Sequence, residues 1–232
     1  MEGICSMNDI VINVKDATKK FEKYTVLNNV NLQCYKGEIC GIVGRNGSGK
    51  TVLFKSICGL VKLNSGEITV NGDVIGKDIS IIKNAGVIIE EPGLLRYKSG
   101  MKNLEYLYMI NNKLDRKYLM TVMEKVGLDP KSRKKVGKYS MGMRQRLAIG
   151  QAIMENPEIL ILDEPMNGLD NHGVEDMRKI FLELKNMGKT ILLASHNRED
   201  IDVLCDKVYE MDRGELKQIR LSKKGEKVRF FY

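Results

Sequence analysis

Short, nearly continuous apolar runs alternate with amphipathic segments along much of the chain. The runs at 38–44, 159–163 and 190–195 carry few polar residues, which is typical of strands buried on both faces of a parallel sheet. Segments 50–59 and 173–187 instead repeat apolar residues every three or four positions, as a helix with one buried face does. Strands that alternate with such helices predict a parallel-sheet α/β core.

Other short segments predict antiparallel strands. Residues 10–14 and 30–35 read as strands, and we expect the polar stretch 16–25 to connect them. Residues 67–75 contain an Asn-Gly pair, which favours the tight turn of a hairpin. A second hairpin is expected at 208–219, where the turn contains an Arg-Gly pair. The first three of these segments predict an antiparallel β side sheet beside the core.

The segments 102–127 and 140–155 predict helices only. They follow an apolar strand at 86–89 and precede the strand at 159–163, so they read as a helical insertion of about 93–155 within the core. No internal repeat and no Gly/Ser linker divides the chain. We therefore expect one domain, residues 1–232.

Candidate chemistry begins at residues 44–51, GRNGSGKT, which match the pattern GxxxxGK(S/T) between a predicted strand and a predicted helix. The glycines allow the backbone to curl until consecutive N–H groups point at phosphate oxygens, and the following helix adds its positive end. Lys50 can reach the β- and γ-phosphates of a nucleotide, and the Thr51 hydroxyl can bind Mg²⁺. The alternative, a glycine turn before an ordinary helix, is disfavoured by the strand–loop–helix context. The predicted nucleotide contacts are Gly44, Arg45, Asn46, Gly47, Ser48, Gly49, Lys50, Thr51 and Val52.

Two carboxylates follow the apolar run ILILD at 159–163. A buried strand that ends at Asp163 can present this side chain to Mg²⁺, and Glu164 beside it is placed to act as general base for an attacking water. An apolar run that ends in acids is a weak signal alone, but together with the glycine-rich loop it predicts nucleotide hydrolysis.

Further motifs resemble the ATPase subunits of ATP-binding-cassette (ABC) transporters over essentially the whole chain. Residues 139–146, YSMGMRQR, are similar to the family signature LSGGQ and the basic residue after it. Residues 165–170 resemble the segment that ends in the D-loop, and Ser195-His196 resembles the switch histidine. The resemblance implies a P-loop NTPase fold of the ABC ATPase type, with a RecA-like parallel-sheet core, an antiparallel side sheet and an inserted helical subdomain.

The resemblance also implies a composite site that binds ATP and Mg²⁺ between two subunits. Ser140, Gly142 and the loop of Asp170 would meet the ATP held by the opposite subunit, and His196 would sense its γ-phosphate. Ser140 is expected to cap the following helix as well. Lys50, Glu164 and His196 are thus the predicted catalytic residues.

Two aromatic residues compete for one implied role. Phe21 lies where the family places an aromatic side chain that stacks on adenine, with core packing as its alternative and Tyr24 as its competitor. His172 has no motif around it, and we expect it on the surface near a helix start.

The chain departs from the family pattern at three positions. Met141 and Met143 replace a glycine and the glutamine of the signature, while Ser140 and Gly142 remain. Glu90 occupies the place of a glutamine that senses Mg²⁺ and the attacking water, so it is a predicted metal ligand beside Thr51 and Asp163. The stretches IIEEP and SMGMRQRL are similar to the bacterial lantibiotic and bacitracin exporter branch. This branch implies export of a peptide antibiotic or a similar amphipathic compound, for self-protection or resistance.

Composition limits where such a protein works. The 232 residues are 43% hydrophobic, which suits a compact core, and the five cysteines show no CxxC spacing. They read as reduced core residues. The start lacks the pattern of a secretory signal, and no run approaches about 18 apolar residues. We expect a cytoplasmic protein on the inner face of the membrane, attached through separate membrane-spanning permease subunits and paired with a second copy or a homologous ATPase.

The net charge of +8 leaves open a second function, which involves binding to ribosomes or nucleic acid. Lys and Arg, without any acid, occupy 130–154, and the tail from Lys217 is also basic. A soluble ABC ATPase acting on ribosomes or nucleic acid would use such charge. However, ribosome-acting relatives carry two cassettes and chromosome or repair relatives carry long coiled coils, and neither occurs here. We expect solvated faces and no nucleic-acid partner. A non-hydrolysing regulatory cassette is disfavoured because Lys50, Asp163, Glu164 and His196 are all present.

Overall fold

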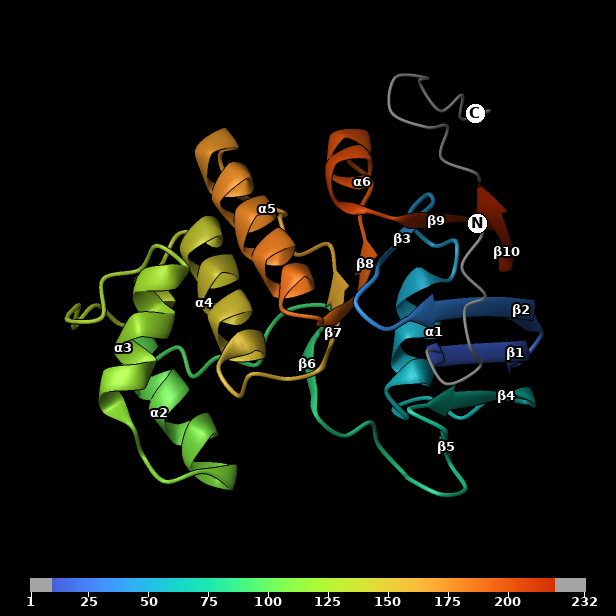
Figure 1. Ribbon diagram of the computed structural model, residues 1–232, viewed down its shortest axis with the longest axis horizontal. Helices are drawn as coiled ribbons and strands as arrows, with labels where there is room; N and C mark the ends of the chain where they lie inside the picture. Colours follow the sequence, from blue (N-terminus) through green and yellow to red (C-terminus); the bar gives the residue numbers. More distant parts are fainter. Residues whose placement is uncertain (1–9, 220–232) are drawn as a thin grey trace.

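A six-stranded sheet forms the centre of the computed structural model, which describes residues 10–219 (Figure 1). Five of its strands are parallel, and only β10, at one edge, runs antiparallel to its neighbour. In sheet order the strands are β10 (Glu215–Ile219), β9 (Lys207–Asp212), β3 (Ile39–Val43), β8 (Thr190–Ala194), β7 (Ile159–Asp163) and β6 (Ala85–Ile88). Every residue of β3 and β8 is buried, which explains their continuous apolar sequence.

Alternate residues of the central strands face two hydrophobic clusters. Ile42 and Leu192 pack with one helix and the side sheet, whereas Ile39 and Leu193 pack with the helices of the opposite face. The helix on the first face is α1 (Lys50–Ile57), and those on the second face include α5 (Asn171–Asn186) and α6 (Arg198–Leu204). The sheet is therefore covered on both sides, as the sequence predicts.

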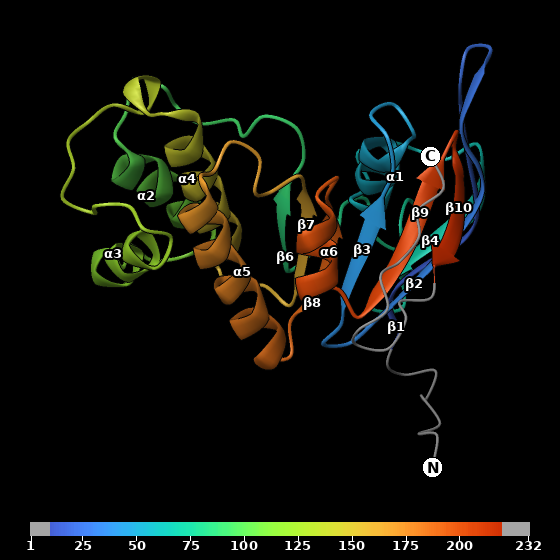
Figure 2. The same ribbon diagram turned by 90° about the horizontal axis from the view of Figure 1, so that it is seen from above.

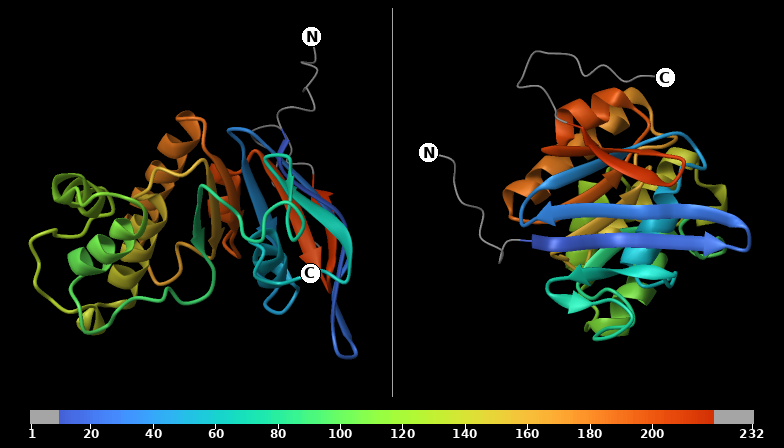
Figure 3. Two further views of the ribbon diagram at one scale, coloured as in Figure 1. Left: turned by 90° about the horizontal axis from the view of Figure 1, so that it is seen from below. Right: turned by 90° about the vertical axis from the view of Figure 1, so that its right-hand side faces the viewer.

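The antiparallel side sheet differs from its prediction in length. Its strands, in order, are β2 (Tyr24–Tyr35), β1 (Ile10–Phe21), β4 (Ser65–Val70) and β5 (Asp73–Val74). The polar stretch 16–25 is not a connection: the strands continue through it to a two-residue turn, where Glu22 has a φ of 50°. Figure 3 shows this hairpin extending past the rest of its sheet. Most side chains there are exposed, so polar residues fit a strand that no core covers.

Three helices lie between β6 and β7 in the chain. They are α2 (Gly100–Asn111), α3 (Arg116–Lys125) and α4 (Met141–Ile153), with a 3₁₀ turn at Val136–Lys138 before α4. The side chains of Ser99, Asp115 and Ser140 cap their N-termini. Figure 2 places these helices at one end of the molecule and the side sheet at the other, with the six-stranded sheet between them.

The cysteines within residues 10–219 are free and buried, as predicted. Burial raises the pKa of the Cys58 thiol to about 12, which keeps it protonated and unreactive. Cys5, the N-terminal residues judged for a secretory signal, and the basic tail from residue 220 lie outside the described residues. None of the helices in the described part has the length and apolar character needed to cross a bilayer.

Candidate active site

The glycine-rich loop connects the end of β3 to the start of α1, as predicted. Gly44, Gly47 and Gly49 all have positive φ values, of 155°, 80° and 116°. Two of them also lie against neighbouring backbone, because a Cβ on Gly44 would come within 2.3 Å of the Met211 carbonyl oxygen and one on Gly49 within 2.7 Å of that of Val26. The loop thus needs glycine both for conformation and for space.

Lys50 folds back across this loop and is only 6% exposed. Its Nζ donates to the carbonyl oxygens of Gly44 at 2.7 Å and Arg45 at 3.2 Å. The neighbouring Ser48 Oγ is buried and has no hydrogen-bond partner among the described residues. A buried cation beside an unpaired hydroxyl and a helix N-terminus is a setting suited to an anion.

Thr51 and Asp163 meet where the start of α1 approaches the carboxyl end of β7. The Thr51 hydroxyl donates to Asp163 Oδ2 at 2.7 Å. Hydroxyl and carboxylate oxygens are ligands that Mg²⁺ accepts, and this ion commonly completes its shell with water and phosphate oxygens. Residues 10–219 hold no cluster of three or more His, Cys, Asp or Glu side chains suited to a metal. The pair therefore fits a magnesium ion that arrives with a nucleotide.

Glu90 follows β6 and lies at the same edge of the sheet. Its backbone has a φ of 59°, and its Oε1 lies 2.7 Å from Lys55 Nζ on α1. The side chain is 62% exposed, so the ion pair is accessible to solvent and weak. The sequence did not predict this ion pair between Lys55 and Glu90.

Glu164 and His196 form a direct pair, although they are 32 residues apart. Glu164 Oε2 lies 2.8 Å from His196 Nδ1, and the other carboxylate oxygen is buried with no partner among the described residues. The Glu164 backbone has a φ of 50° and its N–H donates to Ala194 on β8. A carboxylate that a histidine orients beside a glycine-rich loop is suited to act as a general base for water.

These residues surround a cleft of about 800 Å³. It is lined by the loop from Asn46, by Thr51, Val52, Glu90, Asp163 and Glu164, and by Met141, Arg144 and Gln145 of α4. A second cleft, of about 670 Å³, lies on the other side of the same loop and includes Arg45 and His196. The structure thus brings the predicted phosphate, metal and base residues together.

The predicted adenine contact is not part of either cleft. Phe21 lies at the end of β1, 45% exposed, with Lys19 Nζ 4.7 Å from its ring centre. Tyr24 is even more exposed, and Val26 lines the cleft instead. Stacking of Phe21 on adenine therefore stays a prediction.

The signature residues lie at the start of α4. Ser140 Oγ accepts from the Met143 N–H at 3.2 Å, and Gly142 is packed so that a Cβ would come 3.0 Å from the Gly168 carbonyl oxygen. Asp170 caps α5 by accepting from the Gly173 N–H at 2.8 Å. Ser140, Gly142 and Asp170 do not line the large cleft of their own chain. His172 is exposed at the start of α5, as predicted.

One contact between these motifs has no signal in the sequence. Gln145 Nε2 donates to the Pro165 carbonyl oxygen at 2.8 Å, and a Cβ on Gly168 would collide with the Met141 side chain. The first turns of α4 are therefore tied to the segment that follows Glu164. Met141, one of the two methionines that depart from the family signature, takes part in this contact.

The sequence is similar to those of known proteins. The ABC transporter family matches residues 27–167. The chain is 43% identical over 206 residues to an uncharacterised ABC transporter ATP-binding protein, YybJ, of Bacillus subtilis (strain 168), which covers 89% of this chain and 94% of that protein. It is 37% identical over 210 residues to the bacitracin transport ATP-binding protein BcrA of Enterococcus faecalis, covering 90% and 68%. This similarity confirms the predicted likeness to the bacitracin exporter branch.

The fold agrees as well. A solved ATP-binding subunit of an ABC transporter matches with a TM-score of 0.81 and 26% identity, covering 89% of this chain and 88% of that one. The predicted fold class is thereby confirmed. The chain belongs to the ABC transporter family, as one of its ATP-hydrolysing subunits.

Proposed function

We propose that this subunit hydrolyses ATP at a composite, magnesium-dependent site shared with a second ATPase subunit. The hydrolysis drives export of a peptide antibiotic or similar amphipathic compound through separate membrane-spanning subunits. The observation that carries the proposal is the Glu164–His196 pair, 2.8 Å between Oε2 and Nδ1, at the edge of the cleft formed by the glycine-rich loop.

The loop and Lys50 would bind the triphosphate. N–H groups at the start of α1 and the positive end of the helix attract phosphate oxygens. Lys50 Nζ now donates to two backbone carbonyl oxygens, and a phosphate oxygen is a stronger acceptor for its charge. We therefore expect Lys50 to exchange the carbonyl of Gly44 for the β- and γ-phosphates without leaving the loop.

Thr51 and Asp163 would hold the magnesium ion, with Glu90 as a further oxygen ligand. When bound, Mg²⁺ neutralises charge on the β- and γ-phosphates. Glu90 must then give up its contact with Lys55. A carboxylate in place of the family's glutamine adds negative charge beside the phosphates, so this position would tune the rate and the metal preference.

Glu164 would act as the general base. Its carboxylate accepts a proton from water while the water oxygen bonds to the γ-phosphorus, and the bond to the β-phosphate oxygen breaks to release ADP. His196 donates from Nδ1 to Oε2, which keeps that oxygen occupied and orients the carboxylate. In the imidazolium form its other ring nitrogen would also donate, and so could bind a γ-phosphate oxygen.

The second subunit would complete the site. Ser140, Gly142 and Asp170 do not line the cleft of their own chain, although Met141 between the first two does, and the family resemblance implies that they serve the ATP of an opposite copy. Phe21 would stack on the adenine. Because neither chain alone surrounds the γ-phosphate, ATP closes the pair and hydrolysis releases it.

An exposed apolar stripe on α2 supports a membrane partner. Tyr106, Met109 and Ile110 are 39%, 45% and 72% exposed, and Tyr97 is exposed in the segment after Pro92. Tyr106, Met109 and Ile110 are spaced three and four residues apart, so they share one face of the helix. We assign this exposed stripe to contact with a permease subunit, which would hold the protein at the inner face of the membrane. The similarity to BcrA supports a peptide antibiotic such as bacitracin as the exported compound.

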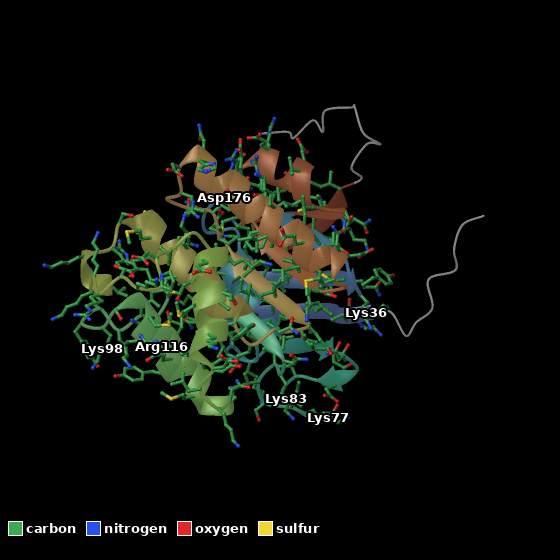
Figure 4. The ribbon with its side chains drawn as sticks, turned by 60° about the vertical axis from the view of Figure 1, so that its left-hand side comes forward. Lys36, Lys77, Lys83, Lys98, Arg116 and Asp176 are labelled. Carbon is green, nitrogen blue, oxygen red and sulfur yellow. The ribbon has the colours of Figure 1, made fainter. Side chains whose placement is uncertain are left out.

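The test co-expresses this chain with candidate membrane subunits in a susceptible bacterium. We expect the inhibitory concentration of bacitracin or of a lantibiotic to rise, and Lys50→Ala to abolish the rise. Lys36→Ala is the matched control: Lys36, labelled in Figure 4, is exposed before β3, at the opposite end of that strand from the glycine-rich loop. Protection that survives Lys50→Ala would contradict the proposal, and tight, salt-dependent binding of nucleic acid would favour the rival function.

A further inference from the structure

A buried ion pair lies directly behind the loop that carries His196. Arg178 of α5 and Asp200 of α6 are 9% and 2% exposed. The Arg178 Nε and Nη2 atoms both reach Asp200 Oδ1, at 2.9 and 2.5 Å, and Nη1 reaches the exposed Glu199 at 3.2 Å. This pair is not used by the chemistry described above.

The second carboxylate oxygen of Asp200 forms a hydrogen bond to Ser195, the residue before His196. Asp200 Oδ2 accepts from the Ser195 hydroxyl at 3.1 Å, and the same Ser195 oxygen accepts from the Asn197 N–H at 3.1 Å. Both neighbours of His196 are therefore held by one chain of hydrogen bonds. His196 projects between them to Glu164.

The partners of Arg178 stabilise its charge. Burial lowers the pKa of the Arg178 guanidinium, but the hydrogen bonds and charges of Glu199 and Asp200 outweigh it and raise that pKa. Burying two charges costs free energy, and apolar side chains of similar size often pack α-helices as well or better. Apolar packing of α5 against the core is already supplied by Ile180, Phe181 and Leu184. A purely structural contact would not need the ionic pair.

We infer that Arg178 and Asp200 are positioning residues for ATP hydrolysis, because they fix the backbone on both sides of His196 and so align it with Glu164. The inference rests on the proposed roles of Glu164 and His196. Since Asp170 caps the N-terminus of α5, the same pair also connects the segment expected to meet the second subunit with the histidine.

The test removes the network without leaving a buried charge. Arg178→Met with Asp200→Leu replaces the pair by apolar side chains, and Ser195→Ala removes only the bridging hydroxyl. For both we expect kcat to fall by about 10- to 100-fold, because a misplacement of about 1 Å costs that much. The dissociation constant and KM for ATP should stay within about twofold. We expect faster amide exchange at Asn197.

The matched control removes another ion pair of the same helix. Lys125 Nζ and Glu183 lie 2.9 Å apart on α3 and α5, away from His196. Lys125→Met with Glu183→Leu should keep the parent kcat. Rates are normalised to the fraction of protein that binds ATP, so loss of folded protein does not imitate the effect.

The outcomes separate the possibilities. A folded double variant with the parent kcat would show that the Arg178–Asp200 pair is structural and would overturn the inference. If that variant fails to fold, an unchanged kcat of Ser195→Ala would overturn it instead. Absence of ATP turnover in the parent protein would contradict the proposed function rather than the positioning role.

Discussion

Single residues of this site are recognisable because their chemistry depends on a local backbone shape. Gly44 and Gly49 lie against the carbonyl oxygens of Met211 and Val26, and Glu164 turns through a positive φ directly after β7. The glycines were predictable from their spacing alone. The turn at Glu164 was not, because a glutamate in this conformation has no sequence signal.

Gly44→Ala tests the space requirement. A Cβ would come 2.3 Å from the Met211 carbonyl oxygen, so β9 or the loop must move, and we expect the free energy of unfolding to fall by roughly 2–4 kcal/mol. Urea denaturation measures this. Gly93→Ala is the control, since a Cβ there meets nothing within 4 Å and its stability should be nearly unchanged. Equal effects of the two substitutions would refute the packing argument.

Contacts between side chains distant in the sequence were harder to anticipate. The sequence predicts separate roles for Glu164 and His196, but not their hydrogen bond. The Arg178–Asp200 pair was missed completely, because its partners lie on two helices and meet only after α5 and α6 pack on the same face of the sheet. Periodicity places each residue on a helix but does not say which helix is its neighbour.

At the scale of elements, apolar patterning predicts the central strands almost residue for residue. β7 matches its predicted bounds and β8 differs by one residue. A strand that is buried on both faces has a continuous apolar sequence, so the ends of the apolar run mark the ends of the strand. The β1–β2 hairpin shows the limit. Its outer half is exposed on both faces, so burial does not impose an alternating pattern, and the polar sequence was wrongly assigned to a connection.

Two helix caps separate stability from function. Ser140 caps α4 and Asp115 caps α3 through equivalent side-chain hydrogen bonds to the third residue beyond. We expect Ser140→Ala and Asp115→Ala each to lower the free energy of unfolding by about 1 kcal/mol. Only Ser140→Ala should also lower kcat, by at least about tenfold, because Ser140 would contact the γ-phosphate in the opposite subunit.

Denaturation and steady-state ATPase assays on both variants make the comparison. Similar kcat values for Ser140→Ala and Asp115→Ala would mean that Ser140 is a helix cap only.

For the whole molecule, the arrangement of its three parts supports the proposal that two chains share one site. The glycine-rich loop, Asp163 and Glu164 lie at the carboxyl edge of the central sheet, where parallel α/β proteins place their ligands. Ser140 and Gly142 lie at the start of α4 in the helical part and do not line the cleft of their own chain, although Met141 between them does. A second subunit would bring the missing donors to the open side of the cleft.

That one subunit supplies the glycine-rich loop and the other the signature residues is predicted only through the family resemblance. Composition and spacing indicate a nucleotide site and a general base. They contain no information about an opposite subunit, because the residues expected to meet it are isolated motif positions and not a periodic apolar face.

The most direct measurement of the central claim is the behaviour of Glu164→Gln with ATP and Mg²⁺. The amide keeps the shape of the side chain but cannot take a proton, so ATP stays bound and the composite site stays closed. We expect turnover to fall at least about 100-fold, and gel filtration with light scattering to show twice the 26.3 kDa of the single chain only when ATP is present. Glu183→Gln, on the exposed side of α5, should behave as the parent. Parent-rate hydrolysis by Glu164→Gln, or a mass that ATP does not change, would contradict the account.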